Sequence, residues 1–222
     1  MEKVLNPIIK ICCISNIEEA NLAIKMGASA LGLVSEMPSG PGVISMEDIK
    51  LIAASIPPPI ATFLLTSKQS VADIIEQHKY CRTNTIQICD NLKLGTHKDL
   101  KNALPGIAIV QVIHVTGEES ILEAMTIQND VDAILLDSGN QSKQIKELGG
   151  TGRTHNWEIS NKMRKILDIP IFLAGGINPE NITQAINQVH PFGIDLCSGV
   201  RTDGKLDEVK LRNLFNKLSC VS

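Results

Sequence analysis

The chain has 222 residues, of which 43% are hydrophobic and 20% are charged, and its formal net charge is −3 at pH 7. This length is normal for one α/β barrel, and the hydrophobic share is enough for a large core. A slightly negative charge argues against a general nucleic-acid-binding protein, which is usually basic. No apolar run approaches the roughly 18 residues of a membrane span, so we expect no membrane partner.

The six cysteines form no CxxC pair and have no Cys/His spacing typical of zinc sites. Several lie within apolar runs, where a free cysteine behaves as a small hydrophobic residue. The first residues lack the pattern of a secretory signal peptide. We therefore expect a reduced, cytoplasmic protein with no structural disulfide and no metal site.

Short apolar, β-branched runs alternate with longer amphipathic stretches along the whole chain, which is typical of βα units on a parallel sheet. Each run is followed by a plausible helix, although residues 90–95 resemble a loop and precede only a short helix near 98–103. The predicted strands, in chain order, are 8–13, 30–34, 60–65, 85–89, 107–113, 133–136, 171–173 and 193–197.

Eight such units predict a single-domain (β/α)8 TIM barrel over residues 1–222. The competing fold is an open doubly wound sheet, which commonly has fewer strands and a glycine-rich phosphate loop after its first strand. Here the first turn, Cys13-Ile14-Ser15, lacks that pattern, and the glycines cluster late in the chain. Barrels often bind phosphate after strands seven and eight, so the late glycines favour the barrel.

Cys12 lies near the end of the first predicted strand and Asp137 directly follows the sixth, and the two are a candidate base and acid. Lys10 lies two residues before Cys12 and so on the same strand face, where its charge could stabilise a thiolate. Cys13 is predicted to point to the opposite face and to pack there. Each assignment has a plainer alternative, because buried cysteines are more often structural and a strand-end aspartate often caps the following loop.

Glycine-rich turns follow the sixth, seventh and eighth predicted strands. A single glycine there is usually only a turn residue, but three turns at one end of consecutive strands favour a phosphate site made of backbone N–H groups. The candidate phosphate-binding residues are Gly150, Gly152, Gly175, Gly176, Ser198 and Gly199.

These residues, in this order and spacing, resemble the phosphoribosylanthranilate isomerase family over nearly the whole chain. Each motif alone is unspecific, and the order and spacing together are specific. The motifs are Lys10-Ile11-Cys12, Gly27-Ala28 with Leu31-Gly32, Leu135-Leu136-Asp137-Ser138, Gly149-Gly150-Thr151-Gly152 with Trp157, Leu173-Ala174-Gly175-Gly176-Ile177, and Asp195-Leu196-Cys197-Ser198-Gly199-Val200.

The resemblance implies an enzyme of tryptophan biosynthesis, an aldose–ketose isomerase that carries out an Amadori rearrangement. It implies that Asp137 is the general acid that protonates the ring oxygen, and that Cys12 is the general base that removes the C2′ proton. It implies a small phosphorylated substrate, no metal or redox cofactor, and a monomer or homodimer. Two alternatives stay open: a related barrel isomerase with a different phosphorylated sugar or amine as substrate, and a non-catalytic protein that binds a phosphorylated ligand.

The chain departs from the family pattern around the aromatic part of the substrate. Cys13 replaces a glycine, Gly42 replaces an arginine that lies near the anthranilate carboxylate, and Arg201 replaces a glutamate. We hypothesise that Arg201, or Arg153, binds the carboxylate instead, because arginine matches a carboxylate in geometry and charge. Lys10 is a further candidate substrate-binding residue. The loop 35–44 has the composition of a lid, which an ordinary turn would share.

Overall fold

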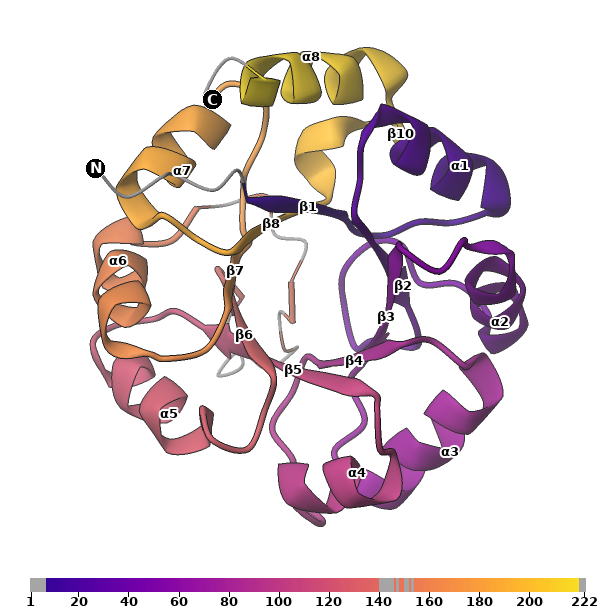
Figure 1. The fold of residues 1–222 in the computed structure, drawn as a ribbon, viewed down its shortest axis with the longest axis vertical. Coiled ribbons are helices and arrows are strands. Elements are labelled where there is room, and N and C mark those ends of the chain that lie inside the picture. Colours follow the sequence, from indigo (N-terminus) through magenta and orange to yellow (C-terminus); the bar gives the residue numbers. More distant parts are fainter. Residues whose placement is uncertain (1–6, 140–145, 147, 150–151, 153, 220–222) are drawn as a thin grey trace.

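The structure of the protein is a computed structural model that describes residues 7–139, 146, 148–149, 152 and 154–219. Eight parallel strands close into a barrel in the order of the sequence, which confirms the predicted (β/α)8 fold (Figure 1). The barrel closes where β1 pairs with β8. The strands are β1 (Ile8–Ile11), β2 (Ala30–Val34), β3 (Ala61–Thr66), β4 (Thr85–Ile88), β5 (Ala108–His114), β6 (Ala133–Asp137), β7 (Ile171–Leu173) and β8 (Gly193–Leu196).

Helices surround the barrel as an outer ring (Figure 1), which is the layer arrangement that buries both faces of a parallel sheet. Within the described ranges, no helix is both long and apolar enough to cross a membrane. The helices are α1 (Ile17–Met26), α2 (Met46–Ser55), α3 (Val71–Cys81), α4 (His97–Ala103), α5 (Glu119–Ile127), α6 (Trp157–Ile166), α7 (Ile182–Val189) and α8 (Glu208–Ser219).

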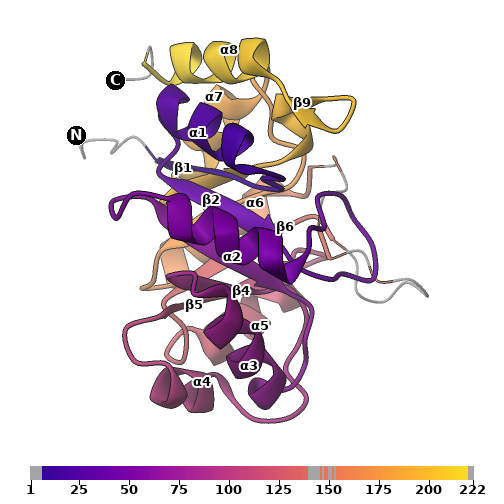
Figure 2. The same ribbon diagram turned by 90° about the vertical axis from the view of Figure 1, so that its right-hand side faces the viewer.

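After β8 the chain forms a short 3-10 turn, η1 (Ser198–Val200), and a small hairpin of β9 (Arg201–Thr202) and β10 (Lys205–Leu206). Figure 2 shows this hairpin and the loop between β2 and α2 at the same end of the barrel. This is the end at which the parallel strands finish, where barrel enzymes carry their chemistry. Residues far apart in the sequence therefore meet there.

All eight predicted strands are confirmed, with small differences at their ends. The largest difference is in the first strand, which was predicted to reach Cys13 and instead ends at Ile11. Cys13 has a φ of 62°, in the left-handed region that strands do not use, so the chain turns there. At the other candidate site, β6 extends one residue further than predicted and includes Asp137.

Two apolar clusters follow from the alternation of side chains along each strand. Ile9 and Ile11 belong to the larger cluster between the strands and the helices. A smaller cluster includes Cys12, Phe63, Leu135 and Phe172, which come from four different strands or strand ends. Side chains of alternate residues therefore fill the barrel and reach its carboxyl end, where polar groups replace them.

Candidate active site

A cavity lies at the carboxyl end of the barrel, and the structure brings most of the predicted site residues together around it. Its lining includes Cys12, Asp137, Gly152, Gly175, Gly176 and Ser198. Two predicted residues, Gly150 and Arg153, lie outside the described residues. Three others, Gly199, Lys10 and Arg201, are described and are not part of this lining. The predicted acid and base therefore share one cavity with most of the described turn residues.

Asp137 is the last residue of β6, and only 6% of its surface is exposed. One carboxylate oxygen, Oδ1, accepts a hydrogen bond from the backbone N–H of Ser138 at 2.7 Å. The other, Oδ2, lies beside Gly149, where an added Cβ would come within 2.8 Å of it. Burial raises the pKa of Asp137 above its ordinary value. The residue is therefore suited to hold a proton that it can donate.

Cys12 follows β1 and lies 5% exposed, with its backbone N–H bonded to the carbonyl of Leu196 at 2.7 Å. An added Cβ at Gly32 would lie 2.8 Å from Cys12 Sγ and 3.1 Å from Lys10 Nζ. The thiol and the ammonium thus both approach the bare backbone of Gly32, on the same side of the strand. This confirms that Lys10 and Cys12 share a face of the strand. A cation in that position stabilises a thiolate.

Lys10 is fully buried inside the barrel and forms an ion pair with Asp195 at 2.9 Å. Its Nζ also lies 5.1 Å from the centre of the Phe63 ring. Burial lowers the pKa of Lys10, but Asp195 and then Cys12 raise it, and the net pKa lies above the ordinary value. Lys10 is therefore a charged residue beneath the cavity. The structure does not support direct binding of a ligand by Lys10, because its ammonium is already paired.

The turns after β6, β7 and β8 come together on the side of the cavity that Ser198 lines. Gly175 and Gly176 both have positive φ values, 83° and 62°. Gly199 does not line the cavity, and an added Cβ there would come within 2.1 Å of the carbonyl oxygen of Ile177. Only glycine fits at that contact, so the turn Ser198–Val200 packs directly on the segment that follows β7.

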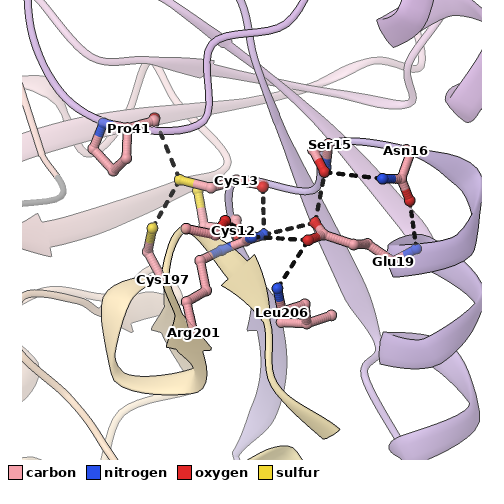
Figure 3. Close-up of polar contacts among 10 residues, drawn as sticks. Cys12, Cys13, Ser15, Asn16, Glu19, Pro41, Cys197, Arg201 and Leu206 are labelled. Carbon is pink, nitrogen blue, oxygen red and sulfur yellow. Dashed lines mark hydrogen bonds and ion pairs between the residues drawn. The ribbon is translucent and has the colours of Figure 1, made fainter.

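The prediction for Cys13 is wrong, because this residue lines the cavity instead of packing on the opposite face. Strand alternation ends at Ile11, and the left-handed backbone at Cys13 turns its side chain toward the mouth of the barrel. Its Sγ lies 3.5 Å from the carbonyl oxygen of Pro41 and 2.8 Å from Sγ of Cys197 (Figure 3). Periodicity alone does not reveal such a turn.

Gly42 faces Cys13, so the two departures from the family pattern are linked by packing. A Cβ added at Gly42 would lie 2.4 Å from Cβ and 2.8 Å from Sγ of Cys13. Real Cβ atoms do not approach other atoms so closely. A side chain at position 13 therefore leaves no room for any side chain at position 42 while the loop keeps this path.

We expect Gly42→Ala to destabilise the protein much more in the native background than in a Cys13→Gly background. Gly42 has a φ of 80°, and an added Cβ would also lie 2.9 Å from Cα of Cys13, so alanine is strained in both backgrounds. The closer clashes, with Cβ and Sγ of Cys13, exist only in the native background. The coupling in a double-mutant cycle should be about 2 kcal/mol, measured by urea unfolding. Additive effects within about 0.5 kcal/mol would contradict the packing described here.

The structure does not place Arg201 where it could bind a substrate carboxylate, contrary to our hypothesis. Its guanidinium pairs with both oxygens of Glu19 at 3.0 and 2.9 Å and donates to the carbonyl of Cys13 (Figure 3). It also donates to the carbonyl of Gly204. Arg201 is only 9% exposed. Arg201 therefore connects the loop after β1 with α1 and with the β9–β10 hairpin through hydrogen bonds and an ion pair.

Glu19 is the centre of this polar cluster. Besides Arg201 it accepts hydrogen bonds from the backbone N–H groups of Ser15 at 3.0 Å and Leu206 at 2.8 Å. Burial raises the pKa of Glu19, but the bonds from Arg201 and the two backbone groups outweigh this, and the net pKa is lowered. The carboxylate is therefore ionised in the folded protein, and it joins three segments that support Cys12.

Glu19→Gln should lower the free energy of unfolding by about 3 kcal/mol, because it leaves the Arg201 charge buried without its partner. The matched control is Glu208→Gln, which removes an exposed ion pair with Arg212. Exposed pairs contribute about 0.5 kcal/mol or less, so the control should change little. Equal effects of the two substitutions in denaturant unfolding would show that the Glu19 cluster is not a structural centre.

Polar contacts join three loops at the carboxyl end of the barrel, those after β2, β4 and β6. The Ser39 hydroxyl, after β2, donates to the carbonyl of Lys146 at 2.6 Å, and the Lys146 ammonium pairs with Asp90, after β4, at 2.5 Å. Ser39, Gly40 and Pro41 line the cavity. The sequence signalled these contacts only through the composition of the loop 35–44, because the residues that pair across the loops lie far apart in the sequence.

The fold and the cavity define a class of protein: a (β/α)8-barrel protein with a strand-end carboxyl and thiol and with glycine turns suited to a small phosphorylated ligand. The model of one family, N-(5′-phosphoribosyl)anthranilate (PRA) isomerase, matches residues 9–217. The chain belongs to this family.

Relatives and solved structures agree with this membership. A protein named N-(5′-phosphoribosyl)anthranilate isomerase from Methanothrix thermoacetophila is 32% identical, over 96% of this chain and 98% of its own length. One from Nostoc punctiforme is 31% identical over 95% and 97%. The crystal structure of phosphoribosyl anthranilate isomerase from Thermotoga maritima has a TM-score of 0.80 and 27% identity, and covers 96% of this chain and 99% of that one.

A further solved phosphoribosyl anthranilate isomerase was crystallised with reduced 1-(o-carboxyphenylamino)-1-deoxyribulose 5-phosphate. It has a TM-score of 0.78 and 25% identity, and it covers 96% of this chain and 99% of that chain. The whole barrel therefore has counterparts of known structure in the family.

Proposed function

We propose that this chain is an N-(5′-phosphoribosyl)anthranilate isomerase of tryptophan biosynthesis, which converts its substrate to 1-(o-carboxyphenylamino)-1-deoxyribulose 5-phosphate. One observation carries this proposal beyond family membership. A buried carboxyl with a raised pKa ends β6, a buried thiol follows β1, and both line one cavity. An aldose–ketose isomerisation needs one proton donor and one proton acceptor on a fixed substrate, which is the pair that this cavity offers.

Asp137 acts first, as the general acid. Its carboxyl gives a proton to the furanose ring oxygen, the C1′–O bond breaks, and the nitrogen lone pair forms the C1′=N bond of a protonated Schiff base. Burial of Asp137 supports this role, because the raised pKa favours the protonated form from which the reaction starts. The bond from Ser138 then stabilises the carboxylate that results.

Cys12 acts next, as the general base. Its thiolate removes the proton from C2′, the electron pair moves into a C1′=C2′ bond, and the C1′=N bond becomes a single bond to nitrogen. The enol so formed gives the ketose by tautomerisation. Lys10 supports this step as a charged residue on the same face as Cys12. One proton is donated and one is removed, so the atoms and electrons of an isomerisation balance.

The substrate phosphate is assigned to the turns after β6, β7 and β8. Gly152, Gly175, Gly176 and Ser198 line the cavity, and Gly199 is packed just behind Ser198. Gly150 belongs to the same motif and lies outside the described residues. Binding energy from this phosphate, which does not react, holds C1′ and C2′ between the acid and the base.

A second candidate function is an isomerase of the same mechanism with a different phosphorylated sugar or amine as its substrate. The observation that favours it is the region around Gly42, where the family pattern has an arginine and Cys13 fills the space. Arg201, the substitute expected from the sequence, is occupied by Glu19. The family pattern implies that this altered region lies near the aromatic end of the substrate, and the acid, the base and the phosphate turns are intact.

Growth without tryptophan tests the proposed function in a cell. We expect the native chain to restore growth to a bacterial strain that lacks its own phosphoribosylanthranilate isomerase. The double variant Cys12→Ala/Asp137→Asn, produced at the same level, should not restore growth. If the native chain is present in folded form and growth does not return, the substrate is a different one.

A further inference from the structure

Two thiols at the mouth of the cavity have no role in the proposed mechanism. Cys13 follows the proposed base directly, and Cys197 directly precedes Ser198 in the proposed phosphate site. They lie near opposite ends of the chain and meet because β1 pairs with β8 when the barrel closes. Their Sγ atoms are 2.8 Å apart (Figure 3), whereas about 2.05 Å separates the sulfurs of a disulfide.

We propose that Cys13 and Cys197 are a thiol-modification site that reacts with low-molecular-weight disulfides, such as oxidised glutathione, to form a reversible Cys13–Cys197 disulfide. Formation of this bond does not depend on the proposed function. Its effect on turnover does rest on that function.

The surroundings divide the two thiols into an attacking and a resolving member. Cys197 is partly exposed, whereas Cys13 is buried. The hydrogen bond with Cys13 lowers the pKa of Cys197, and Arg201 acts in the same direction against the effect of burial. The contacts of Cys13 with Cys12 and then with Cys197 raise its pKa, as does burial. Cys197 is therefore the more accessible thiolate, and Cys13 keeps its proton until the second step.

The reaction is two successive thiol–disulfide exchanges. The Cys197 thiolate attacks one sulfur of oxidised glutathione, the S–S bond of that molecule breaks, and one glutathione thiolate leaves. Cys13 then loses its proton to solvent and attacks Sγ of Cys197. The Cys13–Cys197 bond forms and the second glutathione thiolate leaves. Two protein thiols are oxidised, one small disulfide is reduced to two thiols, and the two protein protons end on those thiols.

The disulfide should slow catalysis because it ties together the two sides of the active site. It brings the Sγ atoms of Cys13 and Cys197 closer by less than 1 Å and fixes the residue after Cys12 to the residue before Ser198. It also removes the S–H group that Cys13 offers to the carbonyl of Pro41, in the loop over the cavity. Displacements of about 1 Å lower rates by up to about 100-fold, so we expect at least a tenfold loss.

The backbone conformation at Cys13 is unfavourable for a residue with a side chain. A non-glycine residue rarely adopts the left-handed region, and the family pattern has glycine at this position. The test variant is therefore Cys13→Gly, which adopts the same backbone without strain. Cys197→Ser is the second variant, and Cys81→Ala is the matched control, since Cys81 is buried in α3 far from the cavity.

In the experiment, each purified protein is incubated with oxidised glutathione and then reduced with dithiothreitol. Its intact mass, linked peptides and turnover are measured before treatment, after treatment and after reduction. We expect the native protein and the control to lose two hydrogen atoms by intact mass and to give a peptide that links Cys13 to Cys197. Both should lose turnover at least tenfold and recover it on reduction. Cys12→Ala should still form the link, whereas Cys13→Gly and Cys197→Ser should form none and keep their own starting turnover.

Three results would overturn the proposal. One is a link through Cys12 in place of Cys13, another is a stable glutathione adduct on Cys197 with no closure, and the third is the same reversible loss of turnover in Cys13→Gly. If the link forms and no isomerase activity exists before treatment, the proposed function fails and the modification site stands.

Discussion

Asp137→Asn should lower kcat by about 100-fold to 10,000-fold, the range expected when a general acid is removed. The amide has the same shape as the carboxyl and has no proton to give to the ring oxygen. Because Asp137 is buried and makes its main polar contact through Oδ1 and the N–H of Ser138, the fold should tolerate the change. Steady-state kinetics with phosphoribosylanthranilate would show a loss in kcat with little change in KM.

The pH dependence separates this role from a merely structural one. Burial raises the pKa of Asp137, so the acid keeps its proton to a higher pH than an ordinary aspartate. Turnover should fall on the alkaline side as that proton is lost, and Asp137→Asn should lack this alkaline limb. A variant that keeps the limb, or that keeps near-native kcat, would remove Asp137 from the mechanism.

Cys12→Ala should lower kcat by about 100-fold or more, because it removes the thiolate that takes the C2′ proton. The measurement is again kcat, with circular dichroism to show that the variant is folded. Cys81→Ala is the control, since Cys81 is equally buried and lies in α3. The control should keep its activity.

An isotope effect makes the test of Cys12 more specific. Substrate with deuterium at C2′ should react more slowly if removal of that proton limits turnover, and the loss of the base in Cys12→Ala should make this step more limiting. A variant with native kcat and no larger isotope effect would show that Cys12 only packs beside the cavity.

Apolar runs that alternate with amphipathic stretches predicted the parallel βα units, because each strand must bury side chains on both faces and each helix must cover the sheet. The late glycine turns then favoured a closed barrel over an open sheet. Placement of Asp137 and Cys12 followed from the same rule, since the carboxyl ends of parallel strands meet at one end. The period-two alternation of side chains along the first strand gave the wrong face for Cys13, because a single residue with left-handed backbone ends that alternation. Local sequence carries little sign of such a turn when the residue is not glycine.

Another error concerned a partner far away in the sequence. Arg201 is close to the barrel mouth, as expected, but Glu19, 182 residues earlier, occupies its guanidinium. The pairs Cys13–Cys197 and Lys146–Asp90 and the contact of Gly42 with Cys13 depend in the same way on closure of the barrel and on loop paths. Hydrophobic patterns with the period of a strand or a helix do not specify which side chains from distant parts of the sequence meet.

The most direct test of the central claim is a fluorescence assay of the purified chain with phosphoribosylanthranilate generated in situ, with Cys12→Ala and Asp137→Asn measured beside it. We predict rapid loss of substrate fluorescence with the native protein and a loss at least about 100 times slower with each variant. A folded native protein that leaves the fluorescence unchanged would contradict the account. The acid and base of this cavity would then serve another phosphorylated substrate.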